Sequence, residues 1–126
     1  MKVMVLVKAT QDSEAGVMPT QELLTAMGEF NASLVKAGIL LAGEGLKPSR
    51  HGKRVRFSGK TRTVTDGPFA ETKDLIAGWM VIDVDTYERA LELAAELSAA
   101  PGAGGKPIHE WLEVRPFLAA PPTITE

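Results

Sequence analysis

The sequence predicts an α+β fold made of two β-α-β halves joined by a β-hairpin. Short runs rich in β-branched residues alternate with two stretches whose apolar residues recur at helical spacing, and a run of alternating charged and apolar residues lies between the halves. The chain has 126 residues and is 44% apolar, which suits one domain with its own core. Two such halves, with both helices on one face of a sheet, are typical of a ferredoxin-like sandwich.

The first half begins with a strand at residues 2–8, where valines alternate with larger apolar residues. Residues 11–19 are polar, and we expect a flexible segment there. A helix follows with Thr20 as its N-cap, because four apolar residues fall on one helical face: Leu23, Met27, Phe30 and Leu34. Gly38 is expected to end this helix, and residues 39–42 to form the next strand.

The middle of the chain predicts a hairpin, and a second β-α-β half follows it. Residues 54–57 alternate arginine with apolar side chains, which indicates a half-buried strand, and residues 61–65 return beside it. Residues 78–84 form the clearest strand. Asp85 and Glu88 have the spacing of a capping box, so we expect Asp85 to cap a helix with one apolar side: Ala90, Leu93, Ala94 and Leu97. A last strand is expected at residues 108–117, which places a single domain over residues 1–117 and a tail over residues 118–126.

Composition excludes several classes of protein. Cysteine is absent, so there are no disulfides, thiolate ligands or cysteine nucleophiles, and we expect a cytoplasmic location. The first apolar run, Val3 to Val7, is too short for a signal peptide or a membrane span, so we expect no membrane partner. A net charge of −2 argues against nucleic acid as a partner. Two scattered histidines predict no metal site, and no cofactor is expected.

A sheet with helices on one face leaves its other face uncovered. Trp79, Val81 and Trp111 would then point to the open side. A second copy of the chain would bury them, so the sequence predicts a homodimer.

The stretch from Asp66 to Lys73 combines a turn with charged residues. Turn chemistry explains the first three residues, Asp-Gly-Pro, and Phe69 would anchor the turn in the core. It does not require Glu71 or Lys73. Two interpretations stay open for these residues: a solvated ion pair, or a cleft shared with Asp66 in which the charged groups perturb one another's ionisation.

Other polar residues could face the same cavity. The last strand places His109, Trp111 and Glu113 on one face, as either a proton-transfer group or part of a dimer interface. Glu44 lies between two glycines at the end of a strand. His51 belongs to a basic stretch, residues 47–62, with seven cationic residues. We expect His51 to be merely exposed, and the basic stretch either to face water or to meet an acidic partner or anionic ligand.

The Asp66–Lys73 motif, followed by Gly78, resembles the hallmark of the YCII-related proteins of the DGPF type. Residues 42–48, 83–85 and 113–116 support the resemblance. It implies a dimeric α+β barrel built from two ferredoxin-like subunits. Some DGPF-type members are associated with extracytoplasmic-function sigma factors, which implies a sigma factor as an alternative partner.

Enzymatic relatives in the broader YCII group include a dehydrochlorinase acting on chlorinated hydroxyhydroquinone. They are thought to use a His–Asp pair whose histidine lies near the start of the first helix. Residues 18–23 here read Met-Pro-Thr-Gln-Glu-Leu, so that histidine is not carried over.

Three hypotheses follow. The favoured one is a homodimer that binds a small polar or aromatic molecule in an inter-sheet cavity, with acid–base chemistry such as elimination or isomerisation as its candidate activity. Its catalytic candidates are Asp66, Glu71, Lys73 and His109, and its ligand-binding candidates are Glu44, Phe69, Trp79, Trp111 and Glu113. The alternatives are an accessory or regulatory protein, and a motif that only builds the turn.

Overall fold

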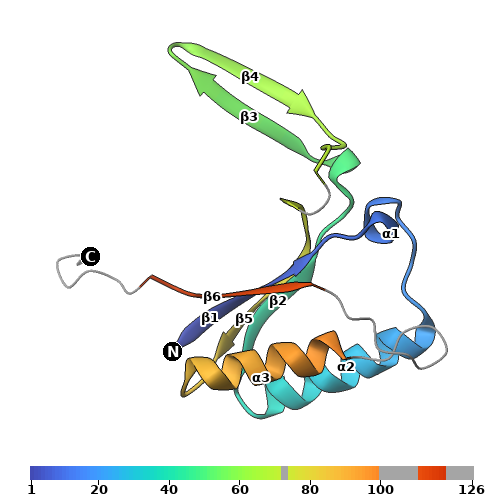
Figure 1. The fold of residues 1–126 in the computed structure, drawn as a ribbon, viewed down its shortest axis with the longest axis vertical. Coiled ribbons are helices and arrows are strands. Elements are labelled where there is room, and N and C mark those ends of the chain that lie inside the picture. Colours follow the sequence, from blue (N-terminus) through green and yellow to red (C-terminus); the bar gives the residue numbers. More distant parts are fainter. Residues whose placement is uncertain (72–73, 100–110, 119–126) are drawn as a thin grey trace.

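A four-stranded antiparallel sheet with two helices on one face forms the body of the protein (Figure 1). The structure, a computed structural model, describes residues 1–71, 74–99 and 111–118. The strands are β1 (Lys2–Lys8), β2 (Leu40–Gly45), β5 (Ile76–Asp83) and β6 (Leu112–Pro116), in the sheet order β2-β5-β1-β6. Every neighbouring pair is antiparallel. This order, with α2 (Gln21–Lys36) and α3 (Tyr87–Ser98) as the crossovers, confirms the predicted ferredoxin-like α+β fold.

The core lies between the sheet and the helices. Val3 and Val5 of β1 and Ile82 of β5 are almost fully buried, and Leu34 of α2 and Leu93 of α3 pack against them. Burial of β1 alternates along the strand, because successive side chains of a strand point to opposite faces. The valine positions therefore face the helices, and Met4 and Leu6 face the open side of the sheet.

The ends of the helices follow local chemistry, with one correction. Thr20 caps α2, accepting from the N–H of Leu23, and Gly38 adopts a φ of 74° beyond its end; both were predicted. The cap of α3 is Thr86 rather than Asp85, so that expectation was wrong. The helix begins one residue later than the capping-box spacing implied, because the hydroxyl of Thr86 accepts from Arg89 N–H at 3.2 Å.

A short helix, α1 (Gln11–Glu14), occupies part of the segment for which flexibility was expected. Thr10 and Ser13 form a reciprocal capping box: each side chain accepts from the backbone N–H of the other residue. This local pairing turns the chain at the end of β1 and gives Glu14 a fixed place.

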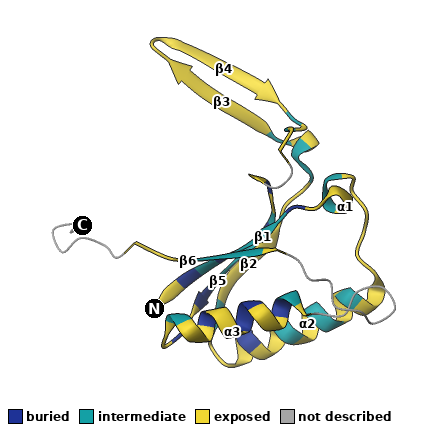
Figure 2. Cartoon of the chain, in the orientation of Figure 1, coloured by how far each residue is buried: buried dark blue, intermediate teal, exposed yellow. Residues whose placement is uncertain are grey.

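The hairpin of β3 (Lys53–Ser58) and β4 (Thr61–Asp66) rises from the sheet on the side away from the helices (Figure 1). A half-buried strand was expected here, and that expectation was wrong. Every residue of both strands is exposed, as Figure 2 shows. The alternating sequence indicates one apolar face, but the described part of the chain places no layer against it.

Two predictions concern residues outside the described ranges. The start of the expected last strand, at residues 108–110, and most of the tail lie there, so the domain boundary at residue 117 stays a prediction. Among the described residues, no helix combines the length and the apolar character needed to cross a bilayer.

Candidate functional site

The Asp-Gly-Pro-Phe turn lies at the base of the hairpin, between β4 and β5. Its Gly67 N–H donates to the carbonyl of Gly52 at 3.0 Å, and the Gly67–Pro68 peptide bond is cis. A Cβ atom at Gly67 would overlap the carbonyl oxygen of Ser49, so only glycine fits. The turn therefore packs closely on the 3₁₀ helix η1 (Ser49–His51), which precedes the hairpin.

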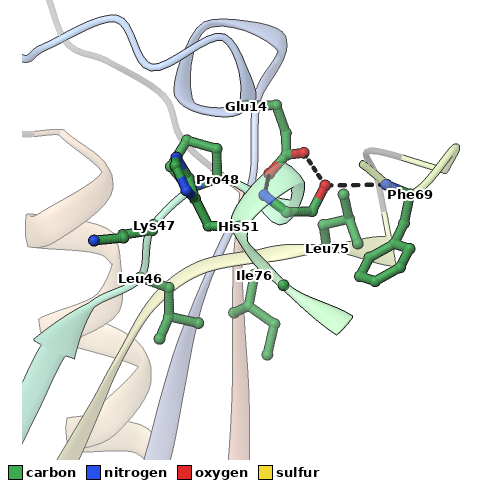
Figure 3. A pocket seen from close by; sticks show the side chains of 10 residues that line it. Glu14, Leu46, Lys47, Pro48, His51, Phe69, Leu75 and Ile76 are labelled. Atoms are coloured by element: carbon green, nitrogen blue, oxygen red, sulfur yellow. Dashed lines mark hydrogen bonds between the residues drawn. The ribbon is translucent and has the colours of Figure 1, made fainter. Parts of the chain in front are cut away.

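Ser49 connects this turn to α1. The backbone N–H of Ser49 donates to Glu14 Oε1 at 2.9 Å, and the Ser49 hydroxyl donates to the other oxygen of the same carboxylate. That hydroxyl also accepts from Phe69 N–H at 3.1 Å (Figure 3). Arg50 donates to the carbonyl of Glu14 at 3.0 Å. Segments separated by 35 and 20 positions are thus held together by one carboxylate and one hydroxyl.

Sequence reasoning missed Glu14. The Thr10–Ser13 capping box was a local signal that could have predicted α1 and the place of Glu14 at its end. No sequence pattern pointed to its partner Ser49, because that contact depends on how the loop after β2 folds back.

A depression of about 350 Å³ adjoins this network. Its lining is largely apolar, with a few polar side chains. The apolar residues are Leu46, Pro48, Phe69, Leu75 and Ile76, and the polar ones include Glu14, Lys47, Ser49 and His51. Figure 3 shows side chains from α1, η1, the turn and the start of β5 converging there. His51 is exposed, as expected, but it also lines this depression.

The predicted residues of the motif have different surroundings. Asp66 is exposed and forms an ion pair with Lys53, its partner across the base of the hairpin. Phe69 is half-buried, and the guanidinium carbon of Arg54 lies 3.9 Å from the centre of its ring. Glu71 is exposed at the end of the turn. Lys73 lies outside the described residues, so a charged cleft formed by Asp66, Glu71 and Lys73 stays a prediction.

The other predicted residues lie on the open face of the sheet. Strand pairing places four residues in one row across the sheet: Glu44, Trp79, Leu6 and Glu113. Glu113 and Arg115 form an ion pair at 3.7 Å, and Trp111, beside the start of β6, is 82% exposed. His109 lies outside the described residues. The structure therefore divides the predicted site into two surfaces, one at the turn and one on the sheet.

The donor groups needed for a metal centre do not gather in the described part of the chain. No three histidine, aspartate or glutamate side chains there lie close enough to hold an ion.

The molecule is a ferredoxin-like α+β protein with an inserted hairpin. At the base of the hairpin, a turn held by hydrogen bonds lies beside a largely apolar depression. The chain belongs to the YCII-related domain family, whose model matches residues 1–119. It is similar to an uncharacterised protein of Rhizobium meliloti (strain 1021), with 36% identity over 102 residues, which is 81% of this chain and 78% of that protein. The family resemblance carried by the Asp66–Lys73 motif is thus confirmed.

Proposed function

We propose that the protein is a homodimer that binds a small molecule in the depression at the base of the hairpin. The observation that carries this proposal is the combination of an apolar lining with a few polar groups in a space of about 350 Å³. Small-molecule sites commonly have volumes of roughly 300–1,000 Å³ and this kind of lining. The proposal places the ligand beside the motif turn, next to Phe69, rather than between two sheets.

The lining suggests the class of ligand. Leu46, Phe69 and Ile76 suit the face of an aromatic or other flat apolar group. His51 lines the same depression and suits a hydroxyl or an anionic substituent on that group, whereas the side chain of Lys47 extends away from the other lining side chains (Figure 3). Glu14 is engaged by Ser49 and helps to shape the depression. The ligand we propose is therefore a small aromatic molecule with one polar or acidic substituent.

Two leucines of similar exposure offer a matched test. Leu46 is 48% exposed and lines the depression, whereas Leu41, on the same segment, is 50% exposed and does not line it. Benzoate, phenol and indole are suitable probes, titrated into the isotope-labelled protein and followed by amide chemical shifts. We expect shifts at Gly52, Phe69 and Ile76, and at least tenfold weaker binding in Leu46→Glu than in Leu41→Glu. Chemical-shift changes found only on the open face of the sheet, around Trp79 and Val81, would contradict binding in the depression and would favour an inter-sheet cavity.

The open sheet face supports the homodimer. Met4 and Leu6 of β1 and Trp79 and Val81 of β5 are only half-buried, and the helices lie on the opposite face. A contiguous apolar face of this kind marks an interaction surface. Acid–base activity is also part of this proposal. Its candidates include Lys73 and His109, which lie outside the described residues.

An accessory protein is the second candidate. The exposed basic hairpin favours it, since a projecting cationic element suits an acidic protein partner such as the sigma factor that the family resemblance implies. A pull-down that depends on Arg54 and Arg56, with no binding of the three probes, would favour this function over small-molecule binding.

A further inference from the structure

The β3–β4 hairpin carries its three large apolar side chains on one face, which at its base also carries the Lys53–Asp66 pair. Residues directly opposite one another share a face, so Val55 lies with Val64, and Phe57 with Arg62. The other face carries arginines and threonines: Arg54, Arg56, Thr63 and Thr65. Phe57 is 74% exposed and Val55 is 56% exposed. Exposed apolar side chains on one face of a projecting hairpin favour contact with another molecule.

An isolated two-stranded hairpin is marginally stable in water, and three or more strands or a covering layer are needed for independent stability. Within the described residues, the contacts that hold this hairpin lie at its base: the pairing of Lys53 with Asp66, the stacking of Arg54 on Phe69, and the bond from Gly67 to Gly52. The apolar residues farther along the hairpin are exposed, so another molecule would have to cover them.

Geometry points to a second copy of this chain as that molecule. The hairpin rises on the side of the sheet away from the helices, which is the side of the open face (Figures 1 and 2). Two sheets packed face to face lie about 10 Å apart, whereas a six-residue strand spans about 20 Å. If the open faces of two copies meet, each hairpin is long enough to extend past the gap and along the other copy.

The opposite net charges of the hairpin and of the rest of the chain also favour a second copy of the chain as the partner. Residues 53–66 carry five cationic side chains and one carboxylate, a charge of +4, and the whole chain carries −2, so the remainder carries −6. The open face itself has an apolar centre, Leu6 and Trp79, between the carboxylates of Glu44 and Glu113. The apolar side of the hairpin matches that apolar centre, and Arg62 beside Phe57 suits the carboxylate of Glu44, whereas Glu113 is already paired with Arg115.

We propose that the β3–β4 hairpin is an arm that packs its apolar face on the open side of a second copy of the chain. Val55, Phe57 and Val64 are the contact residues. This inference rests on the homodimer of the proposed function and adds the surface by which one copy holds the other.

A photo-crosslinking experiment tests the arm directly. Phe57 is replaced by p-benzoyl-L-phenylalanine, and in a matched control Thr63, on the opposite face, is replaced in the same way. We expect irradiation of the Phe57 variant to give a covalent species of twice the 13.5 kDa of one chain, with the attached peptide coming from β1, β5 or β6. The Thr63 control should give at least fivefold less of this product.

A second measurement uses ordinary substitutions. Because Phe57 is exposed in the single chain, Phe57→Ser should leave the far-ultraviolet circular dichroism unchanged. We expect it to raise the dimer dissociation constant at least tenfold, measured by analytical ultracentrifugation, whereas Thr63→Ala should change it less than twofold.

The outcomes separate this inference from the proposed function. A dimeric mass with no covalent dimer, or with a link only within one chain or to a different protein, overturns the arm and leaves the homodimer standing. A monomeric mass by light scattering overturns both the arm and the homodimer. Binding of benzoate, phenol or indole in the depression is decided by its own titration in either case.

Discussion

At the scale of single residues, Ser49 joins three parts of the chain that lie far apart in the sequence. It donates twice to Glu14 of α1 and accepts from the backbone of Phe69. Hydrogen bonds to an ionised group are stronger than those between neutral groups. The conformation of the motif turn therefore depends on a carboxylate outside the motif.

The substitution Glu14→Gln tests this dependence. The amide keeps the shape of the side chain but loses the charge and one of the two acceptor oxygens, so we expect a loss of about 1–2 kcal/mol in the free energy of unfolding. Glu29→Gln, at an exposed position on α2, is the control and should change it by less than about 0.5 kcal/mol. Urea denaturation followed by tryptophan fluorescence measures both. Equal effects would contradict a structural role for Glu14.

Gly67 allows a second test at this scale. In Gly67→Ala the added methyl group would overlap the carbonyl oxygen of Ser49, so we expect a loss of about 1–3 kcal/mol from the strain of overpacking. Gly28→Ala is a control of opposite sign: nothing lies within 4 Å of its Cβ position, and alanine in a helix should add about 0.5–1 kcal/mol. Thermal unfolding of the two variants beside the parent measures this contrast, and an unchanged Gly67→Ala would argue against the close packing.

At the scale of elements, α3 shows how an amphipathic helix attaches to the sheet. Its buried residues recur on one side, and Tyr87 at its start donates its hydroxyl to the carbonyl of Val114 at 2.8 Å. This bond links the first turn of α3 to β6, and the apolar side of the helix packs on β1 and β6. Apolar burial, together with this hydrogen bond, fixes the helix on the sheet.

Two leucines of α3 allow this burial to be tested. Leu93 is 4% exposed, and Leu91, two positions earlier on the same helix, is 45% exposed. We expect Leu93→Ala to cost about 2–5 kcal/mol, since it removes contacts and leaves a cavity. Leu91→Ala should cost less than about 1 kcal/mol. Guanidinium denaturation of both variants measures the difference; similar costs would mean that α3 does not pack as described.

The sequence predicted the elements whose cause is local. The strand at residues 2–8, the cap at Thr20 and the glycine that ends α2 follow from side-chain spacing and backbone conformation within a few residues. The burial of β3 was mispredicted because burial depends on what lies opposite a strand, which alternation alone does not specify. The motif turn was predicted in the same local way, whereas its support by Glu14 involves residues 35 positions apart and has no periodic pattern.

At the scale of the whole molecule, the sheet has one covered face and one open face. The rows Glu44–Trp79–Leu6–Glu113 and Ala42–Val81–Met4–Arg115 run across all four strands on the open side. The apolar centre of these rows and the arm that rises beside them are parts of one proposed interface.

A charge placed in that centre should prevent the proposed homodimer from forming. We expect Val81→Lys to convert the homodimer to a monomer of 13.5 kDa, because a lysine in a desolvated apolar contact lacks a partner. Leu91→Lys, on the outer side of α3, carries the same charge change and should stay dimeric. Multi-angle light scattering after gel filtration measures both masses. A dimeric Val81→Lys variant would mean that the copies meet elsewhere.

The place where the hairpin leaves the sheet has a practical consequence. It departs after β2 and returns before β5, and these two strands are neighbours whose ends meet at Gly45 and Gly78. The chain therefore leaves and re-enters the body at nearly the same point, and the exposed tip of the hairpin is the kind of site that tolerates insertions. We expect a fluorescent protein inserted at the hairpin tip, Gly59–Lys60, to leave the sheet intact and to serve as an optical reporter of the proposed assembly.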